Sequence, residues 1–221
     1  EPVRSTRYVV FVGPRPSEVA GVIVHLGALL VHSVENVTTI DLHPYAVEHP
    51  LSMDMTPPAT PFNLDQIEAG TPLQDHVLHH ESGLTLLSNF VGSGDIGQPT
   101  LEEAQALLSF PGDGENLTLV DVPLRPPTLV KDLAKESLLI VIVSEEHPAT
   151  LAATRSTVDL LREQGVEDAR LGFVLLKRDG GISEGAPEIG VLATLPTNLA
   201  SNHPGWQDLK GHILEKLSSR S

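Results

Sequence analysis

Apolar residues along the chain fall into short β-branched runs that alternate with longer segments of helical spacing. Residues 8–12 form a β-branched and aromatic run that ends in Gly13-Pro14, which predicts a strand followed by a loop. Residues 19–32 are apolar over a helical length, and residues 37–42 predict a second strand stopped by His43-Pro44. The chain therefore opens as strand, helix, strand.

The same alternation continues to the end of the chain. Further strands are predicted over residues 84–87, 117–120, 138–143, 171–176 and 190–195, and further helices over residues 63–69, 72–79, 100–109, 128–136, 148–164 and 205–217. Thr100 and Glu103 have the spacing of a capping box, and Gly165 closes the helix before it. Residues 44–61 are rich in proline and predict a long irregular connection.

Strands that alternate with helices indicate a parallel sheet covered by helices on both faces. The continuous aliphatic run over residues 138–143 is typical of a strand buried in the middle of such a sheet. The sequence thus predicts an α/β fold with three layers, in which a doubly wound, mostly parallel sheet has about seven strands. A length of 221 residues suits a single domain over residues 1–221.

Composition narrows the choice of partner. The formal net charge of −15 argues against direct nucleic-acid binding, which needs a basic face, and against broad attraction to anionic lipid. We therefore expect protein partners and no peripheral membrane contact. The absence of cysteine excludes disulfides and thiolate metal sites and fits a cytoplasmic protein.

No apolar run is long enough to span a bilayer, so no integral membrane segment is expected. The first residues lack the apolar core of a signal peptide. An abrupt start before a strand would also fit one domain of a longer protein.

The strand, loop and helix of residues 8–30 resemble the opening of the MinD/ParA ATPases. In that family a strand leads through Lys-Gly-Gly-x-Gly-Lys-Thr into a helix. Aligned without a gap, Arg15 falls on the signature lysine, Ala20 on the lysine that reaches the phosphates, and Gly21 on the threonine that holds Mg²⁺. Pro16, Ser17 and Val19 fall on the three glycines, and Gly13 ends the strand just before the loop.

These replacements remove what a phosphate-binding loop needs. Such a loop turns successive backbone N–H groups toward the phosphates, and glycine allows the required close approach. Pro16 has no N–H, Glu18 places a carboxylate where polyphosphate would lie, and Ala20 has no charge. The resemblance therefore implies a degenerate loop, and we expect no cofactor, although ATP with Mg²⁺ is the alternative to test.

The resemblance extends over most of the chain and implies a fold like that of P-loop NTPases. Residues 39–44 resemble the family's Ile-Asp-x-Asp-Pro stretch, with Asp41 kept and His43 in place of the second carboxylate. Residues 119–123 resemble the switch segment, with Asp121 in the Walker B-like place, and Leu176 replaces the asparagine that reads adenine. Without a phosphate loop, we expect Asp41 and Asp121 to be vestigial and to cap loops through local backbone hydrogen bonds.

Within the family, the chain most resembles the bacterial CpaE/TadZ branch of pilus-assembly localisation proteins, in which departures in the phosphate loop are common. The resemblance implies a pseudo-ATPase with no catalytic residues, which localises or scaffolds other machinery and forms a homodimer without nucleotide. The alternative is a weak or unusual ATP-binding and ATP-hydrolysing enzyme that uses a rearranged loop.

Four other features admit more than one interpretation. A helix over residues 72–79 would bring His76, His79 and His80 together as metal ligands, but a solvated helix end is the interpretation we favour, with no metal site. Arg15 either binds an anion or holds its loop in place through a neighbouring carboxylate.

The glycines of residues 92–97 indicate a flexible loop and not a dinucleotide site. The apolar face of the helix over residues 205–217 indicates packing on the domain's own sheet and not on a membrane.

Overall fold

The computed structural model describes residues 7–65, 73–109, 116–125, 127–177 and 187–219. Eight strands form one sheet in the order β3-β4-β2-β5-β1-β6-β7-β8. Their bounds are β1 Arg7–Val12, β2 Asn36–Asp41, β3 Val77–His79, β4 Thr85–Leu87, β5 Asn116–Asp121, β6 Leu139–Glu145, β7 Leu171–Lys177 and β8 Val191–Pro196. All neighbouring pairs are parallel except β3 and β4. The predicted three-layer α/β fold is confirmed.

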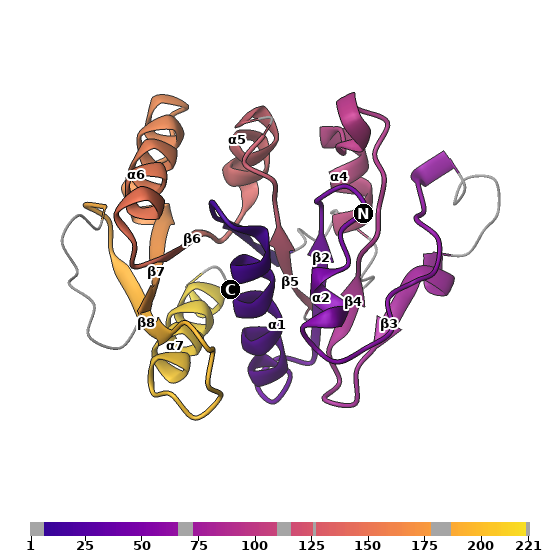
Figure 1. Ribbon diagram of the computed structural model, residues 1–221, viewed down its shortest axis with the longest axis horizontal. Helices are drawn as coiled ribbons and strands as arrows, with labels where there is room; N and C mark the ends of the chain where they lie inside the picture. Colours follow the sequence, from indigo (N-terminus) through magenta and orange to yellow (C-terminus); the bar gives the residue numbers. More distant parts are fainter. Residues whose placement is uncertain (1–6, 66–72, 110–115, 126, 178–186, 220–221) are drawn as a thin grey trace.

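Helices cover both faces of this sheet (Figure 1). The helices are α1 Pro16–Leu30, α2 Glu48–Leu51, α4 Leu101–Leu108, α5 Pro127–Glu136, α6 Pro148–Glu163 and α7 Gly205–Ser218. α1 and α7 pack on one face, where their apolar side chains form a core with β1, β5 and β6. α4, α5 and α6 pack on the other face and form a second core. Both faces of the central strands are therefore buried, which explains why β6 is a continuous aliphatic run.

One predicted element is wrong. The helix expected over residues 72–79 ends at His76 as a short 3₁₀ turn, and Val77–His79 continues as the strand β3. β3 runs antiparallel to β4 at the edge of the sheet, with Val77 opposite Leu87. Three residues are too few for a periodicity to distinguish strand from helix. The backbone N–H and C=O groups along the outer side of β4 pair with residues 77–79 and make them a strand. This edge strand is the eighth, where about seven were expected.

The remaining boundaries agree with the sequence to within a few residues. The capping box is present, because Thr100 Oγ1 accepts a hydrogen bond from the Glu103 backbone N–H and the Glu103 carboxylate accepts one from the Thr100 N–H. Gly165 takes φ +84° just after α6, a left-handed conformation that glycine adopts without strain. Within the irregular stretch after β2, α2 is a single helical turn. Of the helix expected over residues 63–69, the part from residue 66 onward lies outside the described residues.

The terminal helix packs as expected. Trp206, Leu209, Ile213 and Leu217 of α7 are buried in the same core as α1. The Trp206 ring stacks on His25 of α1 at 5.6 Å between ring centroids, and its Nε1–H donates to the Ala200 carbonyl at 3.1 Å. In the part of the chain that the structure describes, no helix combines the length and apolar character needed to cross a membrane.

Candidate functional site

Several residues singled out from the sequence gather at the carboxyl ends of the central strands of the sheet. Gly13 and Arg15 follow β1, Asp41 ends β2 and Asp121 ends β5, and these three strands are neighbours. The parallel register pairs Asp41 with Asp121, and Asp121 in turn with Phe11 of β1. Carboxyl ends of parallel strands are where α/β proteins usually place their ligands. The topology thus brings the β1–α1 turn and the two aspartates together.

The β1–α1 turn is built as an ordinary helix start. Arg15 has an extended backbone and Pro16 occupies the first helical turn. The N–H groups of Glu18 and Val19 both donate to the Arg15 carbonyl, at 3.2 and 3.3 Å. Pro16 has no N–H to offer. Three of the backbone nitrogens that would line a phosphate site are therefore satisfied internally or lack a hydrogen.

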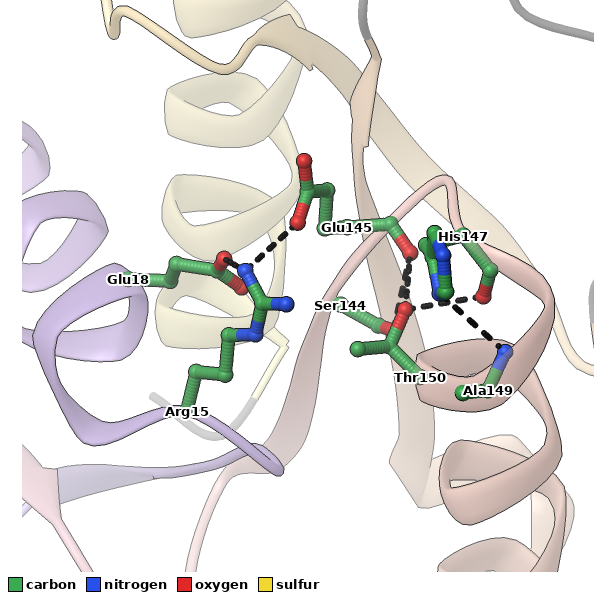
Figure 2. A network of polar contacts seen from close by, with 7 residues as sticks. All are labelled: Arg15, Glu18, Ser144, Glu145, His147, Ala149 and Thr150. Carbon is green, nitrogen blue, oxygen red and sulfur yellow. Dashed lines mark hydrogen bonds and ion pairs between the residues drawn. The ribbon is translucent and has the colours of Figure 1, made fainter.

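Arg15 lies between two carboxylates (Figure 2). Its Nη1 donates to Glu145 Oε2 at 2.7 Å and to Glu18 Oε1 at 3.0 Å. The Glu145 side chain is only 3% exposed, whereas that of Arg15 is 49% exposed. Arg15 therefore ties α1 to the end of β6, which is the loop-anchoring role considered from the sequence.

The β6–α6 turn holds Glu145 in place from the other side (Figure 2). Thr150 Oγ1 donates to the carbonyl oxygens of Glu145 and His147, at 2.7 and 2.9 Å. His147 Nδ1 accepts a hydrogen bond from the Ala149 N–H at 3.3 Å and so caps α6. Sequence reasoning missed Glu145, because no pattern along the chain places the end of β6 beside the β1–α1 turn.

Gly13 and Gly21 are explained by close packing. A Cβ atom on Gly13 would lie 2.5 Å from the Val143 carbonyl oxygen in the neighbouring strand β6. A Cβ atom on Gly21 would lie 2.5 Å from Leu199 Cδ1, so the loop after β8 packs where the resemblance places the Mg²⁺-binding threonine. Leu199 itself takes φ +50°, an uncommon conformation for leucine. Ala20 is fully buried in the α1 core.

Asp41 and Asp121 belong to a cluster with two histidines. Asp121 Oδ1 is 3.2 Å from His43 Nε2, and Asp121 Oδ2 is 3.5 Å from His49 Nε2. Asp41 Oδ1 accepts from the His43 backbone N–H at 3.0 Å, and Asp41 Oδ2 is 4.0 Å from His49 Nε2. Asp41 does cap its loop locally, as expected, whereas Asp121 contacts side chains instead. His49 comes from α2 and was not anticipated.

The electrostatics of this cluster are set by burial and by proximity. Burial raises the pKa of Asp41 to about 6, and the Asp121 charge adds to that while His49 and His43 oppose it. Burial also disfavours ionisation of Asp121, but the hydrogen-bonded His43, the nearby His49 side chain and the positive charges of both histidines outweigh it, and the Asp121 pKa is lowered. The pKa values of both histidines are raised because the aspartates overcome the effect of burial. The two aspartates therefore stabilise a positive charge placed beside them, such as that of a protonated histidine.

The other histidines do not converge. Since residues 77–79 form a strand, His76, His79 and His80 do not share a helix face. His76 stacks on Phe62 at 4.5 Å, His79 Nδ1 lies 3.4 Å from Thr85 Oγ1, and His80 Nδ1 accepts from the Ser82 N–H at 3.1 Å. These three histidines therefore make separate contacts within the fold.

The glycines of residues 92–97 form a turn that is held in place. The Glu103 carboxylate accepts hydrogen bonds from the Ser93 N–H at 2.9 and 3.2 Å, and the Gly94 N–H donates to the Gln98 carbonyl at 3.0 Å. The same carboxylate caps α4. The glycines therefore serve a tight turn before α4.

Comparison with solved structures finds the same fold in known proteins. A chain of the MinC:MinD cell division protein complex from Aquifex aeolicus superposes with a TM-score of 0.66 at 14% identity, over 96% of each chain. A ParA family ATPase from Chlorobium tepidum gives a TM-score of 0.66 at 15% identity, over 97% of this chain and 96% of the other. Cobyrinic acid a,c-diamide synthase from Mycobacterium smegmatis, with a bound ATP analogue and magnesium, gives 0.61 at 15% identity, over 97% of both chains.

No protein-family model and no curated protein sequence matches the chain. The likeness is therefore one of structure, and it extends over nearly the whole chain. The chain has the α/β fold of the MinD and ParA ATPases.

Proposed function

We propose that this chain is a non-catalytic domain of the MinD/ParA fold that localises or scaffolds other proteins. Following the CpaE/TadZ resemblance, we assign it to pilus or secretion machinery. The observation that carries the proposal is the Arg15 ion-pair cluster at the start of α1, in which one cation is shared by Glu18 and Glu145. A polyphosphate entering this turn would meet two carboxylates and would have to compete for the guanidinium.

Neighbouring residues support the same proposal. The side chain aligned with the phosphate-reaching lysine, Ala20, is buried and uncharged. Leu199 occupies the space beside Gly21, where the resemblance places the threonine hydroxyl that holds Mg²⁺. Pro16 fixes the backbone and removes one N–H donor. Each of these features disfavours a nucleotide in the usual pose.

We predict that ATP with Mg²⁺ at millimolar concentration does not raise the melting temperature. Ligand at a hundred times Kd would stabilise the protein by about 2.7 kcal/mol, which is a shift of several degrees for a domain of this size. Differential scanning fluorimetry and titration calorimetry measure this directly, with the Chlorobium tepidum ParA family ATPase as the positive control. Micromolar ATP binding would refute the proposal and support the weak ATPase instead.

Self-association without nucleotide is the second expected property. Large apolar side chains are exposed in the loops that follow β2 and β4, at Tyr45 (60%), Leu51 (57%) and Ile96 (85%). Tyr45 lies close to Gly97, so the loop after β2 and the loop after β4 adjoin. Exposed apolar side chains mark a protein contact where they gather into a contiguous patch. The net charge of −15 opposes association, but salt screens it beyond about 8 Å.

We predict a symmetric dimer at tens of micromolar, with a mass unchanged by ATP. Ile96→Glu should shift the light-scattering mass to that of a monomer, because it puts a charge on this surface. Val191→Glu is the matched control, since Val191 is also exposed (51%) but begins β8 at the opposite edge of the sheet, and it should leave the dimer intact. A monomeric wild-type chain would refute the dimer and leave the fold unaffected.

A further inference from the structure

The Asp41–His43–His49–Asp121 cluster has a chemistry that the proposed function does not use. Asp41, His49 and Asp121 are buried, while the His43 side chain is 19% exposed and faces solvent on one side. Asp41, His43 and Asp121 each offer a ligand atom within 4.8 Å of the others. His49 adds a fourth donor, Nε2, at 3.5 Å from Asp121 Oδ2 and 4.0 Å from Asp41 Oδ2.

Two atoms at the centre of this cluster lack a conventional partner. Among the described residues, neither His49 Nε2 nor Asp121 Oδ2 makes a hydrogen bond, although both atoms are buried and lie 3.5 Å apart. A buried imidazole nitrogen and a buried carboxylate oxygen without hydrogen bonds are costly. A shared cation would satisfy both atoms. The lack of hydrogen bonds at these two atoms is an observation independent of the acidic character of the site.

The surrounding contacts orient the donors. Thr39 Oγ1 lies 3.2 Å from His49 Nδ1, which fixes that ring so that Nε2 faces the aspartates. The His43 backbone N–H holds Asp41 Oδ1 at 3.0 Å and leaves Oδ2 for His49. Metal-binding histidines usually have their second nitrogen held in this way.

The spacing and the donor types indicate which ion fits. Zinc–ligand bonds of about 2.0–2.2 Å in a tetrahedral site place neighbouring donors roughly 3.3–3.5 Å apart. His43 and His49 lie 3.2 and 3.5 Å from the two different oxygens of Asp121, and Asp41 Oδ2 lies 4.0 Å from His49 Nε2, so the cluster has to contract for the four donors to share one ion. Two imidazoles favour zinc-like ions over magnesium or calcium, which prefer oxygen alone.

We propose that Asp41, His43, His49 and Asp121 bind one divalent transition-metal ion, Zn²⁺ or an ion of similar preference, without any nucleotide. Two carboxylates and two neutral imidazoles would leave a site with no net charge around the ion. With all four ligands from the protein, the ion has a structural role. It joins α2, and so the loop after β2, to the ends of β2 and β5.

The test is titration calorimetry of the full chain, stripped with EDTA and then titrated with Zn²⁺. Wild type should bind one ion with a submicromolar Kd, and millimolar Mg²⁺ should not compete. His43→Gln and His49→Gln should each weaken binding by more than tenfold, and Co²⁺ should give the visible bands of a tetrahedral site in wild type but not in these two variants. His79→Gln, an exposed imidazole on β3, is the matched control and should bind as wild type does.

Other outcomes would overturn the proposal. The chain has ten histidines, so equal Zn²⁺ affinity in wild type and His43→Gln would mean that the ion binds elsewhere. Absence of Zn²⁺ binding below the micromolar range would mean that the cluster is held by ion pairs alone. If His49→Gln does not fold, His43→Gln decides, because His43 lies at the exposed edge of the cluster. None of these results depends on whether the domain binds ATP or scaffolds other proteins.

Discussion

Gly13→Ala should lower the free energy of unfolding by about 2–3 kcal/mol, because the added methyl group has no room. Its Cβ atom would lie 2.5 Å from the Val143 carbonyl oxygen and 2.6 Å from Val19 Cγ2. The carbonyl belongs to the backbone of β6 in the middle of the sheet, so it cannot move without disturbing the strand pairing. Urea or thermal unfolding measures the change, which corresponds to a loss of roughly 5–10 °C in Tm.

Two other glycines serve as controls for Gly13. Gly21→Ala should cost less, since the contact at 2.5 Å is with Leu199 Cδ1, the end of a flexible side chain. Gly211→Ala, in α7 with nothing within 4 Å of the new Cβ, should stabilise the protein by about 0.5–1 kcal/mol. A Gly13→Ala variant as stable as wild type, but altered in ligand binding, would mean that this glycine serves a ligand and not the packing of the turn.

Much of the fold can be predicted from the sequence because its elements are long and periodic. The aliphatic run of β6 and the capped helices α4 and α6 carry local signals that tertiary packing does not override. The edge strand β3 could not be predicted, since three residues leave too short a pattern. Its conformation is decided by pairing with β4, which follows after the short turn of residues 80–84.

The candidate site divides in the same way. Asp41 and Asp121 were each singled out from the sequence, but their meeting depends on the pairing of β2 with β5. His49 joins them from a proline-rich stretch whose path has no periodic signal, and only the coordinates reveal that α2 turns back over the strand ends. Glu145 was missed for another reason: its partner is Arg15, 130 residues away along the chain. Contacts of that kind depend on the strand order β1-β6, which local patterns do not give.

Arg15→Ala should cost about 1–2 kcal/mol of stability, because it leaves the buried Glu145 carboxylate without its 2.7 Å partner. The cost is smaller than for a fully buried pair, since the Arg15 side chain is 49% exposed and water can partly compensate. Glu145→Gln in the Arg15→Ala background should recover part of the loss by removing the buried charge that Arg15 faces. A double-mutant cycle from urea denaturation should therefore give a coupling energy of about 1 kcal/mol.

The same cycle distinguishes an anchoring arginine from one that binds an anion. Arg162→Ala provides the control, because its bonds to Asp168 at 2.8 and 2.9 Å join two exposed side chains and their loss should leave the unfolding free energy unchanged within error. If Arg15 holds a ligand instead of the loop, Arg15→Ala will match Arg162→Ala in stability and differ from wild type only when phosphate or nucleotide is added. A coupling energy near zero between Arg15 and Glu145 would then remove the main support for a turn closed to polyphosphate. A coupling near 1 kcal/mol would mean that a phosphate group has to compete with Glu145 for Arg15, the only cation that the β1–α1 turn places at the start of α1 among the described residues.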